Sequence, residues 1–383
     1  MSVDERLVFY FPGFDPLDAH AHQRRYERSA AQSGKTWGVD YMVGPVIETD
    51  AGSRMDVVAR YNGQTTRSSI FIQDHNVLIS QLRSIAVWKQ IVVGFGAGAG
   101  IIREGGAHRY LRHAWRFGLF FLFPFLLMAF GLAAAVAIAL APLWIGVSAL
   151  LCIVSVPLAI LFVGKGLMPF SDRFHTLHLF ADWRFALHVA HDDAFARDWI
   201  DEKARNVLKA LDLPSEEVLV ISHSMGASLA LAVIARVQEL KPDALAGRNV
   251  SFVTLGGAAL QCGLLSSATR LRASIGQLAR DPDVNWFDIQ CLTDPIHLYK
   301  CHTAQLCGHR DAVQPKIVPI RFKHSLSSER YNKNKRNFLR MHRQYVLGAD
   351  KKSGFDFTLM TAGPLPAASF AELRSDTPPD LFR

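Results

Sequence analysis

The sequence predicts an α/β fold, with a mostly parallel sheet flanked by helices and interrupted by a two-helix transmembrane hairpin. Three short runs rich in β-branched and aromatic residues predict the sheet: Val218–Ile221, Val250–Leu255 and Val284–Ile289. They begin roughly 30 residues apart with helical sequence between them, which is typical of parallel strands buried on both faces. The hairpin is predicted by a stretch of 48 residues, Phe117 to Gly164, that contains no Asp, Glu, Lys, Arg or His.

This uncharged stretch is too long to be a single membrane span. As a straight helix its 48 residues would extend ~72 Å, more than twice the ~30 Å thickness of the hydrocarbon core. Pro142 and Trp144 near its midpoint supply a helix breaker and an interfacial aromatic side chain. We therefore expect two spans, Phe117–Ala139 and Leu143–Gly164. The alternative, a pair of buried helices in a soluble protein, is disfavoured because soluble cores rarely contain so long an uncharged run.

Basic residues flank the hairpin on both sides, and its turn carries no charge. They are Arg103, Arg109, Arg112 and Arg116 before it, and Lys165, Arg173 and Arg184 after it. The positive-inside rule then places both soluble parts in the cytoplasm. In a bacterium the chain would be an integral protein of the inner (cytoplasmic) membrane, with the lipid bilayer as its partner. The flanks account for much of the formal charge of +8, and no basic run is interleaved with aromatic residues, so we expect no nucleic-acid partner.

The segment 91–116, just before the hairpin, is glycine-rich and basic. It matches the dinucleotide-binding pattern formally at three positions: Gly94, Gly96 and Ala99. That motif also needs an acidic residue about 20 positions further on for the ribose. After Glu104 the next acidic residue is Asp172, so we expect no nucleotide cofactor. The apolar run Ile91–Ile102 is too short to span a bilayer and is interpreted as membrane-apposed or re-entrant.

These features divide the chain into five parts. Residues 1–90 and 165–360 form the α/β domain, 91–116 is juxtamembrane, 117–164 is the hairpin, and the proline-containing segment 361–383 is expected to be loose. The other elements that we expect are a strand at Leu7–Phe11, a β-hairpin around Asn62-Gly63, helices at Val77–Gln90, Thr176–Leu213 and Asn337–Leu347, and a last strand at Lys316–Phe322.

The most informative residues run from Val218 to Leu229, where a buried strand is followed by a tight turn and a helix of small residues. Ser224 lies at the turn, in the context of a nucleophile elbow, where the doubling back of the chain requires small neighbours. Gly226 matches the second glycine of that pattern, whereas Ser222 replaces the first. The alternative is an ordinary turn in which Ser222 or Ser224 caps the helix.

Together with Phe9–Asp15 near the N-terminus, this stretch resembles the α/β-hydrolase superfamily. The resemblance covers residues 7–15 and 176–347. It implies an α/β-hydrolase-like sheet, with the transmembrane hairpin as an insertion, and an oxyanion hole made by the backbone N–H groups of Phe14 and Met225. Pro12 departs from the pattern, because many members of the superfamily carry histidine there.

The superfamily's chain order of serine, acid and histidine implies an acid beyond a later strand. Asp294 follows the Val284–Ile289 strand and begins a turn with Pro295, so we expect it to be the acid. Asp288 lies in the middle of the strand and is the lesser candidate. Alone, Asp294 would also be compatible with an ordinary turn-capping aspartate.

Five histidines follow Asp294 in the chain: His297, His302, His309, His324 and His342. A base placed after the last strand leaves His324, directly behind that strand, and His342. We favour His342, because the polar loop 325–336 is long enough to bring it over the sheet edge and its neighbours are aromatic and apolar.

The resemblance therefore implies a membrane-anchored cytoplasmic serine hydrolase, an esterase, lipase or thioesterase with the triad Ser224, Asp294 and His342. Its substrate would be an ester or thioester, and the membrane anchor favours an acyl lipid. We expect no cofactor and no metal, since the spacing within Cys301–His309 matches no standard zinc site. The alternative is a catalytically inactive scaffold or binding protein of the same fold, which the serine at position 222 and the two candidate histidines support.

Overall fold

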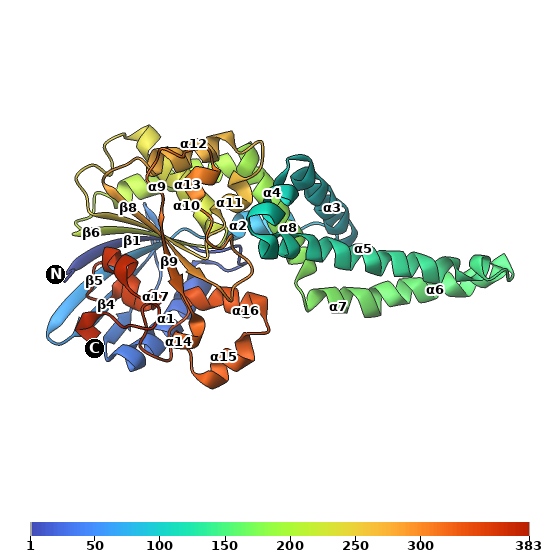
Figure 1. The fold of residues 1–383 in the computed structure, drawn as a ribbon, viewed down its shortest axis with the longest axis horizontal. Helices are drawn as coiled ribbons and strands as arrows, with labels where there is room; N and C mark the ends of the chain where they lie inside the picture. Colours follow the sequence, from blue (N-terminus) through green and yellow to red (C-terminus); the bar gives the residue numbers. More distant parts are fainter. Residues whose placement is uncertain (1, 383) are drawn as a thin grey trace.

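The computed structural model describes residues 2–382 and contains a nine-stranded sheet (Figure 1). The strand order is β2-β4-β5-β1-β6-β7-β8-β9, with β3 also paired to β4. The strands from β5 to β9 in this order are parallel, whereas β4 runs antiparallel to β2, β3 and β5. The predicted α/β architecture with a mostly parallel sheet is confirmed. The strands are β1 (Glu5–Phe11), β2 (Asp40–Val43), β3 (Ile47–Thr49), β4 (Gly52–Tyr61), β5 (Gln64–Ile72), β6 (Glu217–His223), β7 (Val250–Leu255), β8 (Val284–Cys291) and β9 (Lys316–Ile320).

Helices cover both faces of the sheet, with α9, α10 and α12 on one side and α1 and α17 on the other (Figure 1). The α-helices are α1 (Ala19–Trp37), α2 (Asn76–Arg83), α3 (Val87–Arg103), α4 (Gly106–His113), α5 (Trp115–Trp144), α6 (Cys152–Leu161), α7 (Met168–Asp172), α8 (Thr176–His191), α9 (Ala194–Ala210), α10 (Gly226–Leu240), α11 (Ala259–Gly263), α12 (Thr269–Leu278), α13 (Thr303–Leu306), α14 (Phe322–Ser325), α15 (Ser328–Asn334), α16 (Phe338–His342) and α17 (Phe357–Ala362). Short 3₁₀ helices lie at Ala149–Leu151, Arg343–Val346, Ala367–Glu372 and Asp380–Phe382, and a π-helix lies at Phe162–Leu167.

Three expected helices are each divided in the structure. The predicted helix 77–90 breaks at residues 84–86 into α2 and the start of α3. The predicted helix 176–213 breaks into α8 and α9, because Asp192 takes a left-handed conformation (φ 50°) and Asp193 caps the start of α9 through the N–H of Ala196. The predicted helix 337–347 is the short α16 followed by a 3₁₀ turn, Arg343–Val346. The predicted β-hairpin is present as β4 and β5, with Asn62 and Gly63 both at positive φ.

Residues 361–382 pack against the core, so the expectation of a loose segment at 361–383 is wrong for the part that the structure describes. Phe370 and Phe382 are both 1% exposed. The buried Arg6, 2.6 Å from Glu217 on the neighbouring strand, also donates to the carbonyl of Gly363. The four prolines of this segment do not loosen it, because its apolar side chains belong to the hydrophobic core on one face of the sheet.

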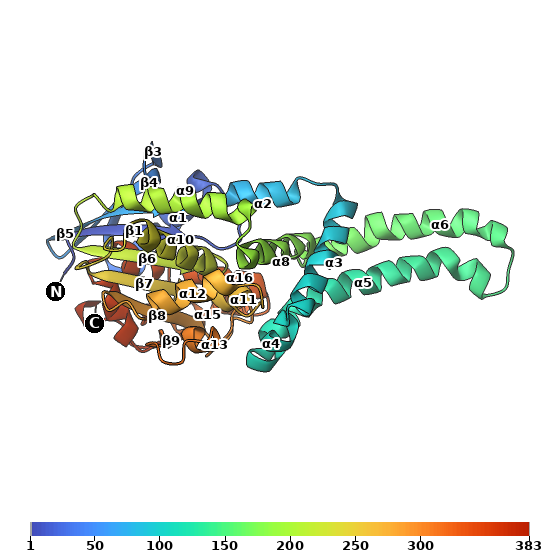
Figure 2. The same cartoon turned by 90° about the horizontal axis from the view of Figure 1, so that it is seen from above.

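Two helical segments long and apolar enough to cross a membrane extend side by side away from the sheet (Figures 1 and 2). They are Trp115–Trp144 and Ala149–Asp172. The first continues beyond its predicted end at Ala139 and contains Pro142, because a proline removes only one backbone hydrogen bond and apolar surroundings favour the helix. Gly146, at φ 71°, lies in the turn, and the Ser155 hydroxyl donates to the carbonyl of Ala139 to join the two helices.

The glycine-rich run predicted to be membrane-apposed or re-entrant forms part of α3. This helix packs against α8 and meets α2 at a bend of 109°. A Cβ atom at Gly94 would overlap the ring of Phe180, and one at Gly98 would overlap Phe125 on α5. The glycines therefore allow close packing between helices. Together, α2 and α3 are long and apolar enough to form a broken membrane span or a re-entrant loop.

Candidate catalytic site

Ser224 lies on a strained turn between β6 and α10. Its φ is 53°, a left-handed value that costs a non-glycine residue ~1–3 kcal/mol and persists only where the surrounding structure fixes it. Here the fully buried strand β6 precedes the turn, and the Ser224 carbonyl accepts hydrogen bonds from the N–H groups of Ala227 and Ala258. The turn thus has the geometry of a nucleophile elbow.

The two small neighbours of this turn have different roles. A Cβ atom at Gly226 would overlap the carbonyl oxygens of Phe11 and Pro12, so only glycine allows β1 to approach so closely. The side chain of Ser222 is fully buried, and its hydroxyl donates to the carbonyl of Val253 at 3.2 Å. A serine is therefore accommodated at the position of the first glycine because a backbone acceptor on β7 satisfies its hydroxyl.

Asp294 and His342 form a buried hydrogen-bonded pair. The distance between His342 Nδ1 and Asp294 Oδ2 is 2.7 Å, and the two residues are 5% and 2% exposed. The carboxylate accepts the proton on Nδ1, which leaves Nε2 as the basic nitrogen of the neutral ring. Nε2 has no hydrogen-bond partner among residues 2–382. The pair thus presents an unoccupied base, oriented by a carboxylate.

Ser224 and His342 line the same cavity, whose volume is about 50 Å³. Gly13 and Phe14, in the turn after β1, line it too. A Cβ atom at Gly13 would lie 3.2 Å from Ser224 Cβ, so the turn runs directly beside the serine. Among residues 2–382, no acceptor takes a hydrogen bond from the backbone N–H of Phe14 or of Met225. The N–H groups of both predicted oxyanion donors are therefore unpaired within the described residues. Phe14 lines the cavity together with Ser224, and Met225 follows Ser224 in the chain.

The electrostatics of Asp294 favour its ionised form. Burial alone would raise the pKa of this carboxyl group, but His342 and His297, both close to Oδ2, hold the pKa well below its usual range. His297 Nδ1 is 3.2 Å from that oxygen, and Oδ1 accepts from the N–H of Ile296. The sequence identified His297 only as one histidine after Asp294, without a role.

The lesser candidates lie away from this cavity. His324, the alternative base, is in α14 and its Nδ1 is 3.1 Å from the hydroxyl of Ser375. Asp288 is buried in β8, bonded to Thr254 and to the indole of Trp286 at 3.2 Å, and burial raises its pKa to about 6. The structure therefore brings Asp294 and His342 together, and neither alternative joins them.

Two further residues of the cavity escaped the sequence reasoning. His223 precedes the candidate nucleophile in the chain, and its Nε2 is 3.0 Å from the carbonyl of His342. Burial, together with the nearby His342 ring, lowers the pKa of His223 to about 3. His223 therefore donates to that carbonyl as a neutral ring and fixes the backbone of the candidate base. Asp15 accepts from Arg25 at 2.8 Å and from Arg343, the residue after His342, at 3.1 Å. Its position in Phe9–Asp15 was visible in the sequence, but its partners were not.

Asp182 of α8 also lines the cavity and is buried. Oδ2 accepts from the amide of Gln261 at 3.1 Å, whereas Oδ1 has no partner among residues 2–382. Burial raises the pKa of this carboxyl to about 7 against the opposing effect of Gln261. No sequence motif marks this aspartate, which lies within the mostly buried helix α8.

Within residues 2–382, no group of three or more His, Cys, Asp and Glu side chains has the arrangement of a metal site. The cavity thus brings together the serine of the turn, a carboxylate-oriented histidine and Phe14, whose N–H is unpaired within these residues. Comparisons with protein-family models, curated proteins and solved structures find no match to this chain.

Proposed function

We propose that this chain is a membrane-bound serine hydrolase of the α/β-hydrolase type, acting on a carboxylic ester or thioester. The observation that carries the proposal is the buried Asp294–His342 pair: His342 lines the same cavity as Ser224, and its Nε2 has no hydrogen-bond partner among residues 2–382. The positive φ of Ser224 and the excluded Cβ at Gly226 support it, because they are the backbone features that an exposed nucleophile on an elbow requires.

The proposed reaction follows from these roles. His342 Nε2 takes the proton of Ser224 as its Oγ attacks the substrate carbonyl carbon, and Asp294 stabilises the imidazolium. The N–H groups of Phe14 and Met225 bind the resulting oxyanion. The bond to the leaving alcohol or thiol then breaks, and His342 returns the proton to that group. Water, activated by the same histidine, releases the acid and regenerates Ser224.

We also propose that the sheet lies against the cytoplasmic face of the membrane. β1, which precedes the hairpin in the chain, pairs with β6, which follows it. Both ends of the hairpin must therefore lie on one side of the bilayer, and the basic flanks favour the cytoplasm. Reporter fusions at the N-terminus and after residue 383 should both give a cytoplasmic signal, and an external signal from either would refute this orientation.

A fluorophosphonate probe tests the enzymatic proposal. Wild-type chain should be labelled and Ser224→Ala should not. The matched control is Ser266→Ala, which changes an exposed serine outside the cavity and should be labelled like wild type. An unlabelled wild-type protein that is shown to be folded would refute the proposal.

One observation favours the alternative, a catalytically inactive membrane scaffold of the same architecture. The cavity at Ser224 holds only about 50 Å³, whereas ligand sites commonly enclose ~300–1,000 Å³. On that alternative Ser224 would be unreactive, and the same labelling experiment distinguishes the two functions.

A further inference from the structure

The small catalytic cavity adjoins two much larger hollows, one apolar and one lined by both polar and apolar side chains. One is an apolar groove of about 760 Å³ along α5, which we call the α5 groove. The other is a hollow of about 660 Å³ between α2, α3 and α8, which we call the polar basin. Phe120 lines both the groove and the catalytic cavity, and His178 lines both the basin and the catalytic cavity. Ser224 therefore lies between the α5 groove and the polar basin.

The α5 groove begins beside the candidate catalytic residues. Pro295 and Phe338 in its wall are the chain neighbours of Ile296 and Leu339 in the catalytic cavity. From Phe120 the groove follows α5 to Phe130, ten residues further on, which is ~15 Å along the helix. Its lining is aromatic and aliphatic apart from Arg116 at its start: Trp115, Leu119, Phe120, Leu122, Phe123, Leu126, Leu127, Phe130, Phe174, Pro295 and Phe338.

The outer part of the groove faces the region where lipid chains would lie. α5 has 30 residues and is ~45 Å long, which exceeds the ~30 Å hydrocarbon core. Phe117 and Phe121 near its start are fully buried against the sheet domain, so the membrane-crossing part is the remainder. There Leu126 and Phe130 are 50% and 72% exposed. A groove exposed to hydrocarbon at one end, and sharing Phe120 with the Ser224 cavity at the other, suits an acyl chain drawn from the bilayer.

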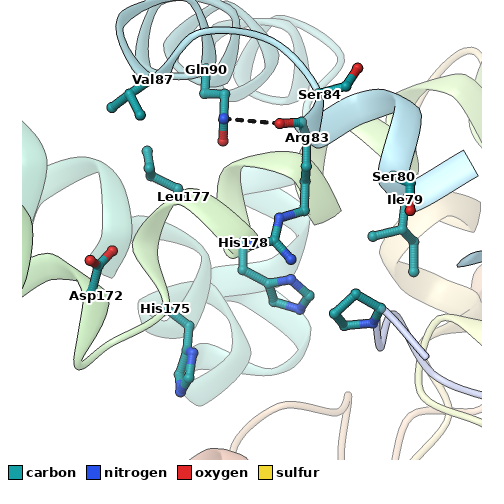
Figure 3. A pocket seen from close by; sticks show the side chains of 11 residues that line it. Ile79, Ser80, Arg83, Ser84, Val87, Gln90, Asp172, His175, Leu177 and His178 are labelled. Atoms are coloured by element: carbon teal, nitrogen blue, oxygen red, sulfur yellow. Dashed lines mark hydrogen bonds between the residues drawn. The ribbon is translucent and has the colours of Figure 1, made fainter. Parts of the chain in front are cut away.

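The polar basin lies at the level of the membrane surface. The second membrane-crossing segment ends at Asp172, which lines the basin, and His175 follows three residues later. Figure 3 shows the side chains of Arg83 and His178 directed into the same space, with the amide of Gln90 donating to the Arg83 carbonyl at 3.1 Å. Burial lowers the pKa of His175 and lowers that of His178 to about 4. Near neutral pH both rings are therefore uncharged and can donate and accept hydrogen bonds.

We infer that the substrate is an amphiphilic ester resident in the bilayer, with its acyl chain in the α5 groove and its polar end in the basin. Its carbonyl then lies at Ser224, in the cavity that borders the groove at Phe120 and the basin at His178. This inference rests on the proposed hydrolase function and names its substrate class. It also accounts for the small volume of the catalytic cavity, since only the ester group itself has to enter it.

The test uses the full chain reconstituted in phosphatidylcholine vesicles. Leu126→Trp fills the groove beyond Phe120, and Leu143→Trp is the matched control, because it changes another leucine of α5 that is 50% exposed and does not line the groove. Hydrolysis of p-nitrophenyl palmitate should fall about tenfold in Leu126→Trp, as expected when about two or more methylene groups lose their contacts. Hydrolysis of p-nitrophenyl butyrate should remain within about twofold of wild type, and Leu143→Trp should leave both rates unchanged.

The polar end is tested in the same vesicles. Arg83→Ala removes a donor from the basin and should slow hydrolysis of monopalmitoylglycerol about tenfold, while p-nitrophenyl palmitate, which lacks the polar end, is hydrolysed as by wild type. Equal effects of Arg83→Ala on the two palmitate esters would overturn the assignment of the basin.

Three results would overturn the inference in distinguishable ways. If butyrate is hydrolysed and Leu126→Trp does not change the palmitate rate, the groove is not the acyl site and the hydrolase proposal stands. If neither ester is hydrolysed and the fluorophosphonate does not label wild type, the hydrolase proposal fails and the inference fails with it. If Leu126→Trp instead converts a dimer to a monomer, the groove is occupied by a second copy of the chain.

Discussion

The sheet domain and the membrane hairpin are stabilised by different interactions. In the sheet domain, two pairs of charged or titratable side chains are buried together: Arg6 with Glu217 at 2.6 Å, and His342 with Asp294 at 2.7 Å. In the hairpin the Ser155 hydroxyl donates a hydrogen bond to the carbonyl of Ala139 on the other helix. Close packing of apolar side chains also holds the helices together. The proposed chemistry therefore depends on buried polar contacts, whereas the hairpin supplies an apolar surface long enough to cross a membrane.

The largest effect is expected from the buried pair itself. His342→Ala should lower kcat/KM for ester hydrolysis by about 10⁴-fold or more, because the base that accepts the Ser224 proton is lost. The matched control is His324→Ala, whose imidazole contacts Ser375 outside the cavity and whose loss should change the rate by no more than about twofold. Thermal unfolding should show both variants folded, and the reverse pattern of rates would make His324 the base.

A second effect comes from a buried carboxyl without a charged partner. Burial raises the pKa of Asp182 from 3.8 to about 7, so the folded state binds this proton more tightly than the unfolded chain. Its contribution to stability is present below pH 3.8 and is lost as the pH rises to about 7, a change of about 4 kcal/mol. Asp182→Asn should abolish that component, so stability should fall less between pH 4 and 7 than in wild type.

The measurement for Asp182 is the free energy of unfolding of both proteins across this pH range in the same micelles. Other groups titrate there, including the buried histidines, so the difference between the two curves is the informative quantity. Parallel curves would show that Asp182 does not bind its proton more tightly in the folded state.

A smaller effect, on the free energy of unfolding, is expected from replacing a glycine of the sheet domain, Gly226, or one of α3, Gly96. Gly226→Ala would push a methyl group into the carbonyls of Phe11 and Pro12 and should lower the free energy of unfolding by about 3 kcal/mol. Gly96→Ala, in α3, meets open space and should change it by no more than about 1 kcal/mol, in the stabilising direction. Thermal unfolding in micelles measures both, and equal changes would remove the steric explanation of Gly226.

Local sequence patterns were sufficient to predict the parallel strands and the position of Ser224. β7 begins and ends where predicted, because a short run of β-branched and aromatic residues favours a strand that is buried on both faces, as in a parallel sheet. The Asn62-Gly63 turn was predictable for a similar local reason, its two positive φ values.

Contacts between residues that are far apart in the sequence could not be predicted from local patterns. His324 and His342 both follow the last strand, and only the path through α14, α15 and α16 brings one of them to Asp294. The packing of 361–382 was missed because its apolar residues are few and their partners lie on strands distant in sequence. Asp182 was missed for the same reason, since its burial depends on α8 packing over the cavity.

The central claim is that Ser224 is a nucleophile activated by the Asp294–His342 pair. The most direct measurement is the mass of the peptide that carries Ser224 after the full chain, in vesicles, has reacted with a fluorophosphonate. We predict a phosphonyl adduct on Ser224 in the wild-type protein and its loss in His342→Ala. An adduct on another residue, or equal modification of Ser224 in the two proteins, would contradict the account.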